Sequence, residues 1–257
     1  MTDMTSRTFA LEGQTPVNRM GYGAMRLTGQ PGNFGPFEDW NTGIALLHRA
    51  SELGVNFFDS AHAYGPQTAD QIVGEALGVS KAVLATKGGV SKSAPDRITV
   101  DGSRSTLHRQ IDQALVNLRR DRIDLFQLHR VDPDIAVEES IAALAEAQDD
   151  GRIRHIGLSN VTREQLDRAL KVAPIASVQN RYNMAEAGDD DLVDYTAAKG
   201  IAFIPYGPLG ANPMQKGAKL DPQAALAWLL KRSPNIIIPG TTAIDHLEEN
   251  IAAWDQL

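Results

Sequence analysis

Cysteine is absent from the 257 residues, so disulfides and thiolate metal sites are excluded. The six histidines show no metal-ligand spacing such as H-E-x-x-H, and we expect no metal ion. No apolar run reaches the roughly 18 residues of a membrane span, and the N-terminal residues 1–7 lack the apolar segment of a signal peptide. We therefore expect no membrane association and a cytoplasmic location.

Positive charge is also scarce, since 25 Lys and Arg oppose 32 Asp and Glu and give a net charge of -7. Proteins that bind nucleic acids carry basic surfaces to neutralise phosphates, so this balance argues against a nucleic-acid partner. We expect instead a small-molecule substrate and a protein that is a monomer or a weak homo-oligomer.

The length and the pattern of apolar residues indicate the fold. A chain of about 250 residues is typical of one (β/α)8 TIM barrel. Short apolar runs alternate with helical patterns, with one run roughly every 25 to 40 residues, as in successive βα units. We expect a single (β/α)8 barrel domain over residues 1–257, preceded by a hairpin at residues 8–14 that covers its base. The expected strands are residues 17–22, 55–58, 82–86, 123–128, 153–158, 176–179, 201–205 and 236–238.

Polar residues stand at the ends of three successive expected strands. Asp59, Lys87 and His129 each follow an apolar run, and Tyr64 comes shortly after Asp59. In barrels of parallel strands the loops beyond the strand carboxyl ends form the active site, so these side chains should meet at one rim.

This set of side chains suits the reduction of a carbonyl group. A tyrosine is a weak acid, but a nearby Lys87 ammonium would make the proton of Tyr64 easier to release. Asp59 would keep Lys87 charged and oriented, and His129 could donate a hydrogen bond to the carbonyl oxygen. In the alternative interpretation they are ordinary polar residues at strand ends, one pair of them a solvated ion pair.

The segment after the first strand is a candidate substrate lip. It begins like a dinucleotide fingerprint, but Arg26 stands where the third glycine would be. A Gly- and Pro-rich loop follows, over residues 26–40, with interleaved aromatic residues, and it is long enough to be functional. We take Met25, Arg26, Phe34 and Trp40 as candidate substrate contacts. The aromatic side chains could equally be a structural plug of the barrel mouth.

Six sequence blocks together resemble the aldo-keto reductase family, in order from about residue 17 to residue 253. They are FDSA at 58–61 with YG at 64–65, ATK at 85–87, LFQLH at 125–129, IGLSN at 156–160, QN at 179–180 with YN at 182–183, and IPGT at 238–241. The resemblance implies a β/α barrel that reduces an aldehyde or ketone with NADP(H), with NAD(H) as the alternative cofactor. It places a catalytic tetrad on Asp59, Tyr64, Lys87 and His129, with Tyr64 as the proton donor.

The resemblance also implies a cofactor site. Ser159, Asn160 and Gln179 would hold the nicotinamide carboxamide, and Tyr206 would stack on the nicotinamide ring. The remaining implied cofactor positions are Gly207, Leu209, Gly240 and, at the adenosine end, Thr241, His246, Glu249 and Asn250.

The sequence departs from the family pattern at the adenosine end. Gly240 and Thr242 stand where many relatives carry Lys or Arg, and His246 replaces a common Arg. A preference for the 2'-phosphorylated cofactor should then be weaker than in those relatives. The loop between Tyr206 and the seventh helix is short, and no long C-terminal loop follows the eighth helix, so we expect an open, shallow substrate site.

Two other functions stay open. Barrels of this family also serve as redox-sensing subunits that bind the cofactor with little turnover. A barrel that handles phosphates would instead need a glycine-rich loop after strands seven and eight, to which Gly207, Gly210 and Gly240 could contribute. Within the aldo-keto reductases, the segments at residues 16–27 and 232–235 look most like those of a bacterial branch that includes pyridoxal reductases.

Overall fold

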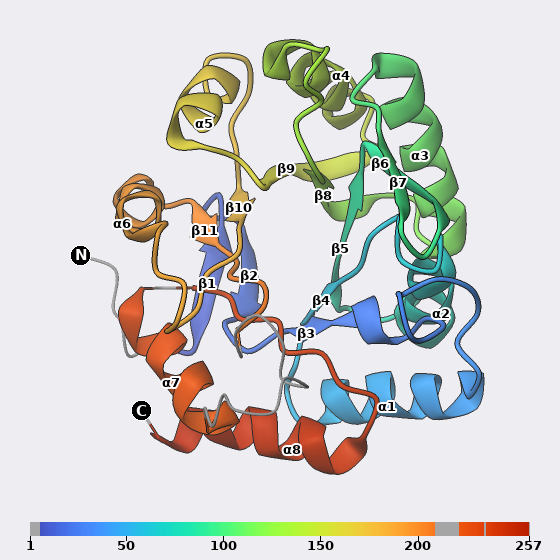
Figure 1. Cartoon of the computed structure of the whole chain (residues 1–257), viewed down its shortest axis with the longest axis vertical. Helices are drawn as coiled ribbons and strands as arrows, with labels where there is room; N and C mark the ends of the chain where they lie inside the picture. Colours follow the sequence, from blue (N-terminus) through green and yellow to red (C-terminus); the bar gives the residue numbers. More distant parts are fainter. Residues whose placement is uncertain (1–5, 209–220, 234, 257) are drawn as a thin grey trace.

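The computed structural model describes residues 6–208, 221–233 and 235–256 (Figure 1). At its centre is a parallel sheet with the strand order β11-β10-β9-β8-β5-β4-β3. Its strands are β3 (Tyr22–Gly23), β4 (Phe57–Asp59), β5 (Val83–Gly88), β8 (Ile123–Leu128), β9 (Ile153–Ser159), β10 (Ser177–Gln179) and β11 (Ala202–Phe203). Parallel neighbours require crossover connections, and helices supply them.

The helices form a ring around the sheet (Figure 1). They are α1 (Trp40–Glu52), α2 (Thr68–Leu77), α3 (Arg104–Asn117), α4 (Val137–Asp149), α5 (Arg163–Ala169), α6 (Asp190–Lys199), α7 (Pro222–Arg232) and α8 (Ile244–Ala252), with short 3₁₀ turns η1 (Ala24–Arg26) and η2 (Ala253–Gln256). Local sequence fixes several starts. Thr162 and Gln165 form a capping box before α5, and Asp221 caps α7 ahead of Pro222.

Residues 236–238 close the sheet into a barrel. The amide of Ile236 donates to the carbonyl of Phe203 at 3.0 Å, next to β11, and the amide of Ile237 donates to the carbonyl of Arg19 at 2.8 Å. The amide of Gly21 in turn donates to the carbonyl of Ile237 at 2.8 Å. This segment therefore takes the eighth strand position, as the sequence predicts, and the (β/α)8 barrel is confirmed.

An antiparallel hairpin of β1 (Thr8–Leu11) and β2 (Thr15–Asn18) lies at the base of the barrel. Its buried apolar side chains join those that line the lower barrel interior, in a cluster that includes Leu11, Val17 and Phe57. The expected hairpin is confirmed, but the expected first strand at residues 17–22 is wrong in its bounds. Val17 pairs with β1, and the barrel strand begins only after the chain has turned.

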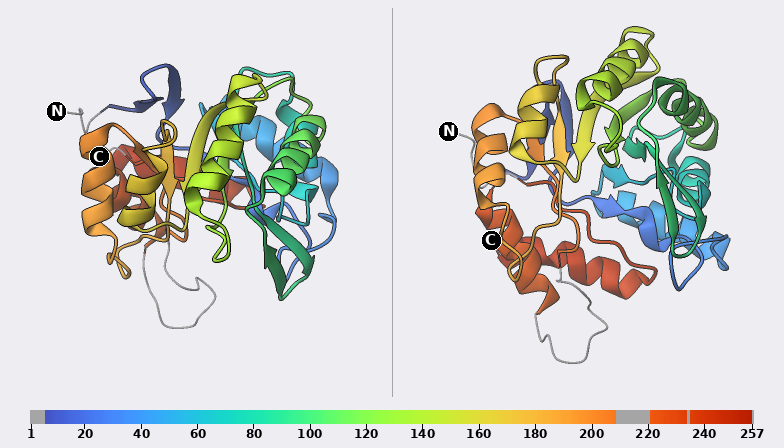
Figure 2. Two further views of the ribbon diagram at one scale, coloured as in Figure 1. Left: turned by 90° about the horizontal axis from the view of Figure 1, so that it is seen from above. Right: turned by 45° about the horizontal axis from the view of Figure 1, so that its top comes forward.

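A second antiparallel hairpin, β6 (Val90–Ala94) with β7 (Arg97–Val100), was not expected from the sequence. It follows β5 directly and projects from the end of the barrel opposite to the β1–β2 hairpin (Figure 2). Its residues are mostly exposed or half-buried, so it has no clear apolar alternation to mark it in the sequence.

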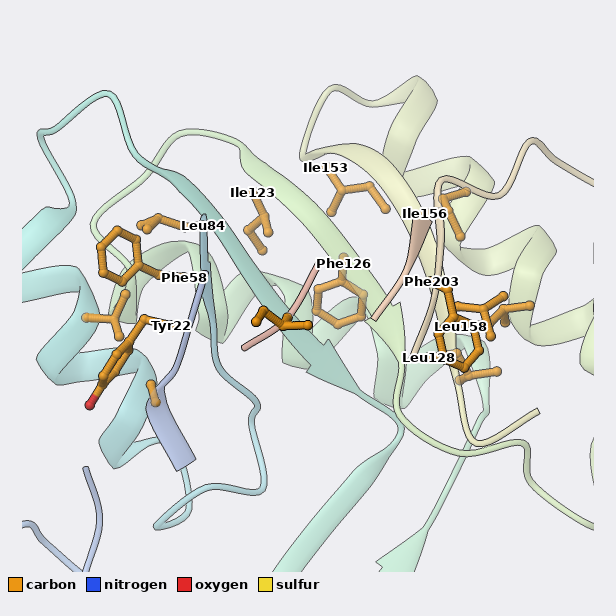
Figure 3. Close-up of a cluster of buried hydrophobic side chains, with 14 of the residues drawn as sticks. Tyr22, Phe58, Leu84, Ile123, Phe126, Leu128, Ile153, Ile156, Leu158 and Phe203 are labelled. Carbon is orange, nitrogen blue, oxygen red and sulfur yellow. The ribbon is translucent and has the colours of Figure 1, made fainter. Parts of the chain in front are cut away.

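The main core lies between the sheet and its ring of helices. Figure 3 shows side chains from several strands in this layer, among them Phe58, Leu84, Phe126 and Leu158. All four are fully buried. Burying a side chain of this size contributes about 1.5–3 kcal/mol, so this layer holds the strand ends in fixed positions.

Three expectations concern residues outside those that the structure describes. They are the cofactor contact at Leu209, the shortened loop before α7, most of which is not described, and the end of the chain at Leu257. Within the described ranges, no helix combines the length and apolar character needed to cross a membrane.

Candidate active site

The carboxyl ends of β4 and β5 bring together a buried ion pair. The ammonium of Lys87 donates to Asp59 Oδ2 at 2.6 Å and to the carbonyl oxygen of Ser60 at 2.7 Å. It also lies 3.4 Å from the hydroxyl of Tyr64. The side chains of Lys87 and Asp59 are 0% and 2% exposed. The pair is therefore desolvated, and the interpretation as a solvated surface pair is wrong.

The second carboxylate oxygen of Asp59 is held by two amides. Gln127 Nε2 donates to Asp59 Oδ1 at 2.9 Å, and Gln179 Nε2 donates to the same oxygen at 3.1 Å. These bonds hold the oxygen to which Lys87 does not donate, so both oxygens of the carboxylate are fixed. Sequence reasoning gave Gln127 no role. The available signal was a polar residue in the apolar second half of the strand, two positions before His129 and so on the same face of the sheet.

Charge and burial oppose each other at Lys87. Burial lowers the pKa of Lys87, but Asp59 and then Tyr64 raise it, and the net shift is upward. Lys87 is therefore a cation at neutral pH. Burial raises the pKa of the Tyr64 hydroxyl, and the ammonium of Lys87 lowers it by less than burial raises it. The sequence-based expectation was that Lys87 makes Tyr64 a stronger acid. Lys87 does lower the pKa of Tyr64, but burial raises it more, so the net shift of this pKa is upward.

His129 lies edge-on to Tyr64, with ring centroids 5.9 Å apart and an interplanar angle of 87°. Burial and then the ammonium of Lys87 lower the pKa of His129 well below its usual value, so its ring is neutral at pH 7. A neutral imidazole carries one N–H donor. Its Nδ1 is buried and has no hydrogen-bond partner among the described residues.

Ser159, Asn160 and Tyr206 form a connected group at the ends of β9 and β11. Asn160 Nδ2 donates to the Ser159 hydroxyl at 3.0 Å and to the carbonyl oxygen of His129 at 3.0 Å. The hydroxyl of Tyr206 donates to Asn160 Oδ1 at 2.7 Å. Asn160 adopts a left-handed conformation with φ 56°, which asparagine tolerates better than most residues. The structure thus connects three of the four expected nicotinamide contacts, while Gln179 is engaged with Asp59.

The expected adenosine-end residues lie on the connection after the eighth strand position and on the first two turns of α8. Gly240, His246 and Glu249 are exposed, whereas Thr241 is buried. Thr241 is held in place because the Tyr22 hydroxyl donates to its carbonyl oxygen at 2.5 Å. Asn250, the residue after Glu249 in α8, is half-buried, and Gly207 lies apart from this group, after β11, with φ 64°.

The candidate substrate residues are divided between two settings. Phe34 pairs with Gly65, so the loop over residues 26–39 is bonded to the loop that carries Tyr64. Met25 and Arg26 belong to η1 and are exposed. Trp40 is different, since it is the first residue of α1 and packs against the main core. Its expected place in the loop is therefore wrong.

The β6–β7 hairpin reaches the same loop. The Lys92 ammonium donates to the carbonyl oxygen of Gly32, and Pro95 lies against Gly32. A second segment next to the barrel mouth thus supports the loop over residues 26–39, and sequence reasoning missed it. Among the described residues no group of His, Asp and Glu could hold a metal ion.

A second buried carboxyl, Asp70, lies on the first turn of α2. Its Oδ1 accepts from the Thr86 hydroxyl at 2.9 Å, and its Oδ2 has no partner among the described residues. Burial raises its pKa from 3.8 to about 6, and the Ser60 and Thr86 hydroxyls offset only part of this rise. Sequence reasoning missed Asp70, which precedes an apolar helical pattern like any acidic residue in a first turn.

We expect Asp70→Asn to change how stability depends on pH. The folded pKa is raised, so the unaltered protein gains stability from the proton on Asp70 at low pH and loses it as pH rises from about 4 through about 6. A shift of this size corresponds to about 3 kcal/mol. Since asparagine does not titrate, the free energy of unfolding of the variant relative to the unaltered protein should rise by about 2 kcal/mol between pH 4 and pH 7, which is most of the full effect.

Urea denaturation at the two pH values measures this difference. Asp112→Asn is the control, because Asp112 is exposed and pairs with Arg152 at the surface. An equal change for both variants would show that Asp70 is not responsible.

The fold and the site define the class of protein: a (β/α)8 barrel with a buried Asp–Lys pair beneath a tyrosine at its carboxyl-end rim. The chain belongs to the aldo/keto reductase family, whose model matches residues 19–223. It is 42% identical to pyridoxine 4-dehydrogenase of Escherichia coli (strain K12) over 269 residues, covering 97% of this chain and 93% of that protein. It is 39% identical over 254 residues to an uncharacterized oxidoreductase of Schizosaccharomyces pombe, covering 94% and 83%.

Solved structures agree on the fold. The glycerol dehydrogenase of Gluconobacter oxydans superposes with a TM-score of 0.83 at 24% identity, covering 97% of this chain and 94% of that one. An aldo-keto reductase of Klebsiella pneumoniae in complex with NADPH gives a TM-score of 0.81 at 24% identity, covering 97% and 89%. Both support the barrel architecture.

Proposed function

We propose that this protein reduces an aldehyde or ketone to an alcohol with NADP(H), with Tyr64 as the proton donor. The observation that carries the proposal is the fully buried Lys87, which binds Asp59 and reaches the Tyr64 hydroxyl at 3.4 Å. Desolvating an ammonium costs several kcal/mol, and its pairing with a carboxylate offsets this cost only in part, so a buried Lys87 beside the part-buried Tyr64 favours a catalytic role.

The side chains would divide the work as follows. A bound nicotinamide supplies the hydride that adds to the carbonyl carbon. Tyr64 gives its proton to the carbonyl oxygen as negative charge develops there, and the Lys87 ammonium stabilises the resulting phenolate. Asp59 keeps Lys87 charged and fixed. His129, neutral at pH 7, donates a hydrogen bond to the same carbonyl oxygen and orients it.

The residues at the rim fit a nicotinamide nucleotide. Tyr206 presents a half-exposed ring, and Asn160 and Ser159 offer amide and hydroxyl groups suited to a carboxamide. Gly207 and Gly240 leave backbone without side chains where a pyrophosphate and adenosine could approach. Support also comes from the relatives, one of which is named for dehydrogenation of pyridoxine and another of which binds NADPH.

A spectrophotometric assay of NADPH and NADH oxidation over a panel of aldehydes that includes pyridoxal tests the proposal. We expect aldehyde-dependent oxidation, faster with NADPH than with NADH at equal concentrations. Tight NADPH binding without turnover on any aldehyde would contradict it and favour a redox-sensing subunit. Absence of both binding and turnover would exclude both functions.

A further inference from the structure

The barrel closes where residues 19–23 lie beside residues 237–240, and we call this contact the seam. Backbone atoms of the two segments pack directly against each other there. A Cβ atom built on Gly240 would lie 2.5 Å from the carbonyl oxygen of Gly23, and one built on Gly23 would lie 2.7 Å from the carbonyl oxygen of Ile238. Contacts this short to backbone atoms require the seam to open. No side chain, and hence no cation, can therefore be placed at residue 240 in this structure.

The connection that follows carries little positive charge of its own. Residues 239–252 contain Asp245, Glu248 and Glu249 and no Lys or Arg. Glu248 is paired with Arg49 at 2.7 Å, which leaves two exposed carboxylates, Asp245 in the first turn of α8 and Glu249 in its second turn. A phosphate monoester bound here would meet anionic side chains and would need a cation from another segment.

Arg26 lies across the seam from this connection. Its Cγ is 3.8 Å from the point where a Cβ of Gly240 would stand, and its side chain is exposed. In the described part of the chain Arg26 has neither an ion pair nor a hydrogen bond, unlike the paired Arg49, Arg168 and Arg232 of the surface. Its guanidinium can therefore turn over Gly240 toward Thr241 without breaking an existing contact.

We propose that Arg26 binds the 2'-phosphate of the cofactor from across the seam and so sets the preference for the phosphorylated nucleotide. The proposal rests on the proposed function, since it requires the adenosine end of NADP(H) at residues 240–250. Arginine is suited to this role because its fork of N–H donors can hold a phosphate bidentately. Arg26, expected from the sequence to contact the substrate, then belongs to the cofactor site.

Equilibrium binding of 2',5'-ADP and of 5'-AMP tests this assignment without turnover. Both nucleotides lack nicotinamide, and they differ in the 2'-phosphate. Loss of a charge-assisted bond costs about 1.5–3 kcal/mol, so Arg26→Gln should weaken 2',5'-ADP binding by roughly 10- to 100-fold and leave 5'-AMP binding nearly unchanged. Adding Thr242→Arg, at the exposed neighbour of Thr241, should restore part of the loss.

Arg122→Gln is the matched control, because this exposed arginine stands just before the amino end of β8, away from the rim. It should not change either affinity. Equal weakening of both nucleotides by Arg26→Gln would assign Arg26 to the 5'-phosphate and overturn the proposal. Unchanged affinities would also overturn it and direct attention to Lys216 and Lys219, which lie outside the described residues. Failure of the unaltered protein to bind either nucleotide would instead refute the proposed function.

Discussion

Replacing Tyr64 with phenylalanine should lower turnover at least about 100-fold, the effect typical of a lost general acid. The hydroxyl group is 3.4 Å from the Lys87 ammonium, and burial keeps it protonated at neutral pH, so it holds the proton that the reduced carbonyl oxygen needs. Phenylalanine keeps the ring against His129 and removes only the hydroxyl. Steady-state kinetics with an aldehyde and NADPH measures the effect.

Measuring the affinity for NADPH distinguishes a loss of catalysis from a loss of cofactor binding. We expect it to change little in Tyr64→Phe, because the interaction lost is one made in the transition state. Tyr195→Phe is the control, since its hydroxyl donates to Asp167 on the outer helices and not at the rim. A Tyr64→Phe protein with near-normal turnover would remove Tyr64 from the mechanism, and a matching loss in Tyr195→Phe would indicate a general structural effect.

The convergence of the tetrad could be predicted because it depends on topology alone. Asp59, Lys87 and His129 each end a strand or follow one, and parallel strands in a barrel place their carboxyl ends at one rim. No knowledge of side-chain packing is needed for this step. The eighth strand position at residues 236–238 could be predicted for the same reason, because a closed barrel needs it.

The partners of these residues could not be predicted, because they depend on burial and on distances across the barrel. Gln127 and Gln179 are far apart in sequence, and only the closed sheet brings both amides to Asp59. The upward shift in the pKa of Tyr64 likewise depends on how deeply the hydroxyl is buried. Asp70 looks like any acidic residue at a helix start until α2 is packed against β5.

The seam is a further case in which local sequence is insufficient. Glycines at 21, 23 and 240 look like loop residues or fragments of a nucleotide fingerprint. In the folded chain a Cβ on Gly23 or Gly240 would meet a backbone oxygen across the seam at 2.7 or 2.5 Å, and a Cβ on Gly21 would lie 2.9 Å from the carbonyl oxygen of Phe57 in β4. The close approach of neighbouring backbone segments in the closed barrel therefore explains why these positions carry no side chain.

Replacing Lys87 with methionine should both abolish most activity and destabilise the fold. The variant leaves the carboxylate of Asp59 buried, with Gln127 and Gln179 on one oxygen and no partner on the other. Breaking a buried pair in this way costs about 3–5 kcal/mol. For a domain of this size the loss corresponds to a decrease in Tm on the order of 10 °C. Thermal unfolding followed by circular dichroism measures it.

The double variant Asp59→Asn with Lys87→Met distinguishes a lost pair from a general packing defect. It removes the unpaired charge while keeping similar volumes, and replacing both members of a buried pair is often close to neutral. Its Tm should therefore lie nearer to that of the unaltered protein than the Tm of Lys87→Met does, although both variants lack activity. A double variant that unfolds at or below the temperature of Lys87→Met would show that the cost comes from packing around residue 87. The carboxylate of Asp59 would then be solvated well enough to stand alone.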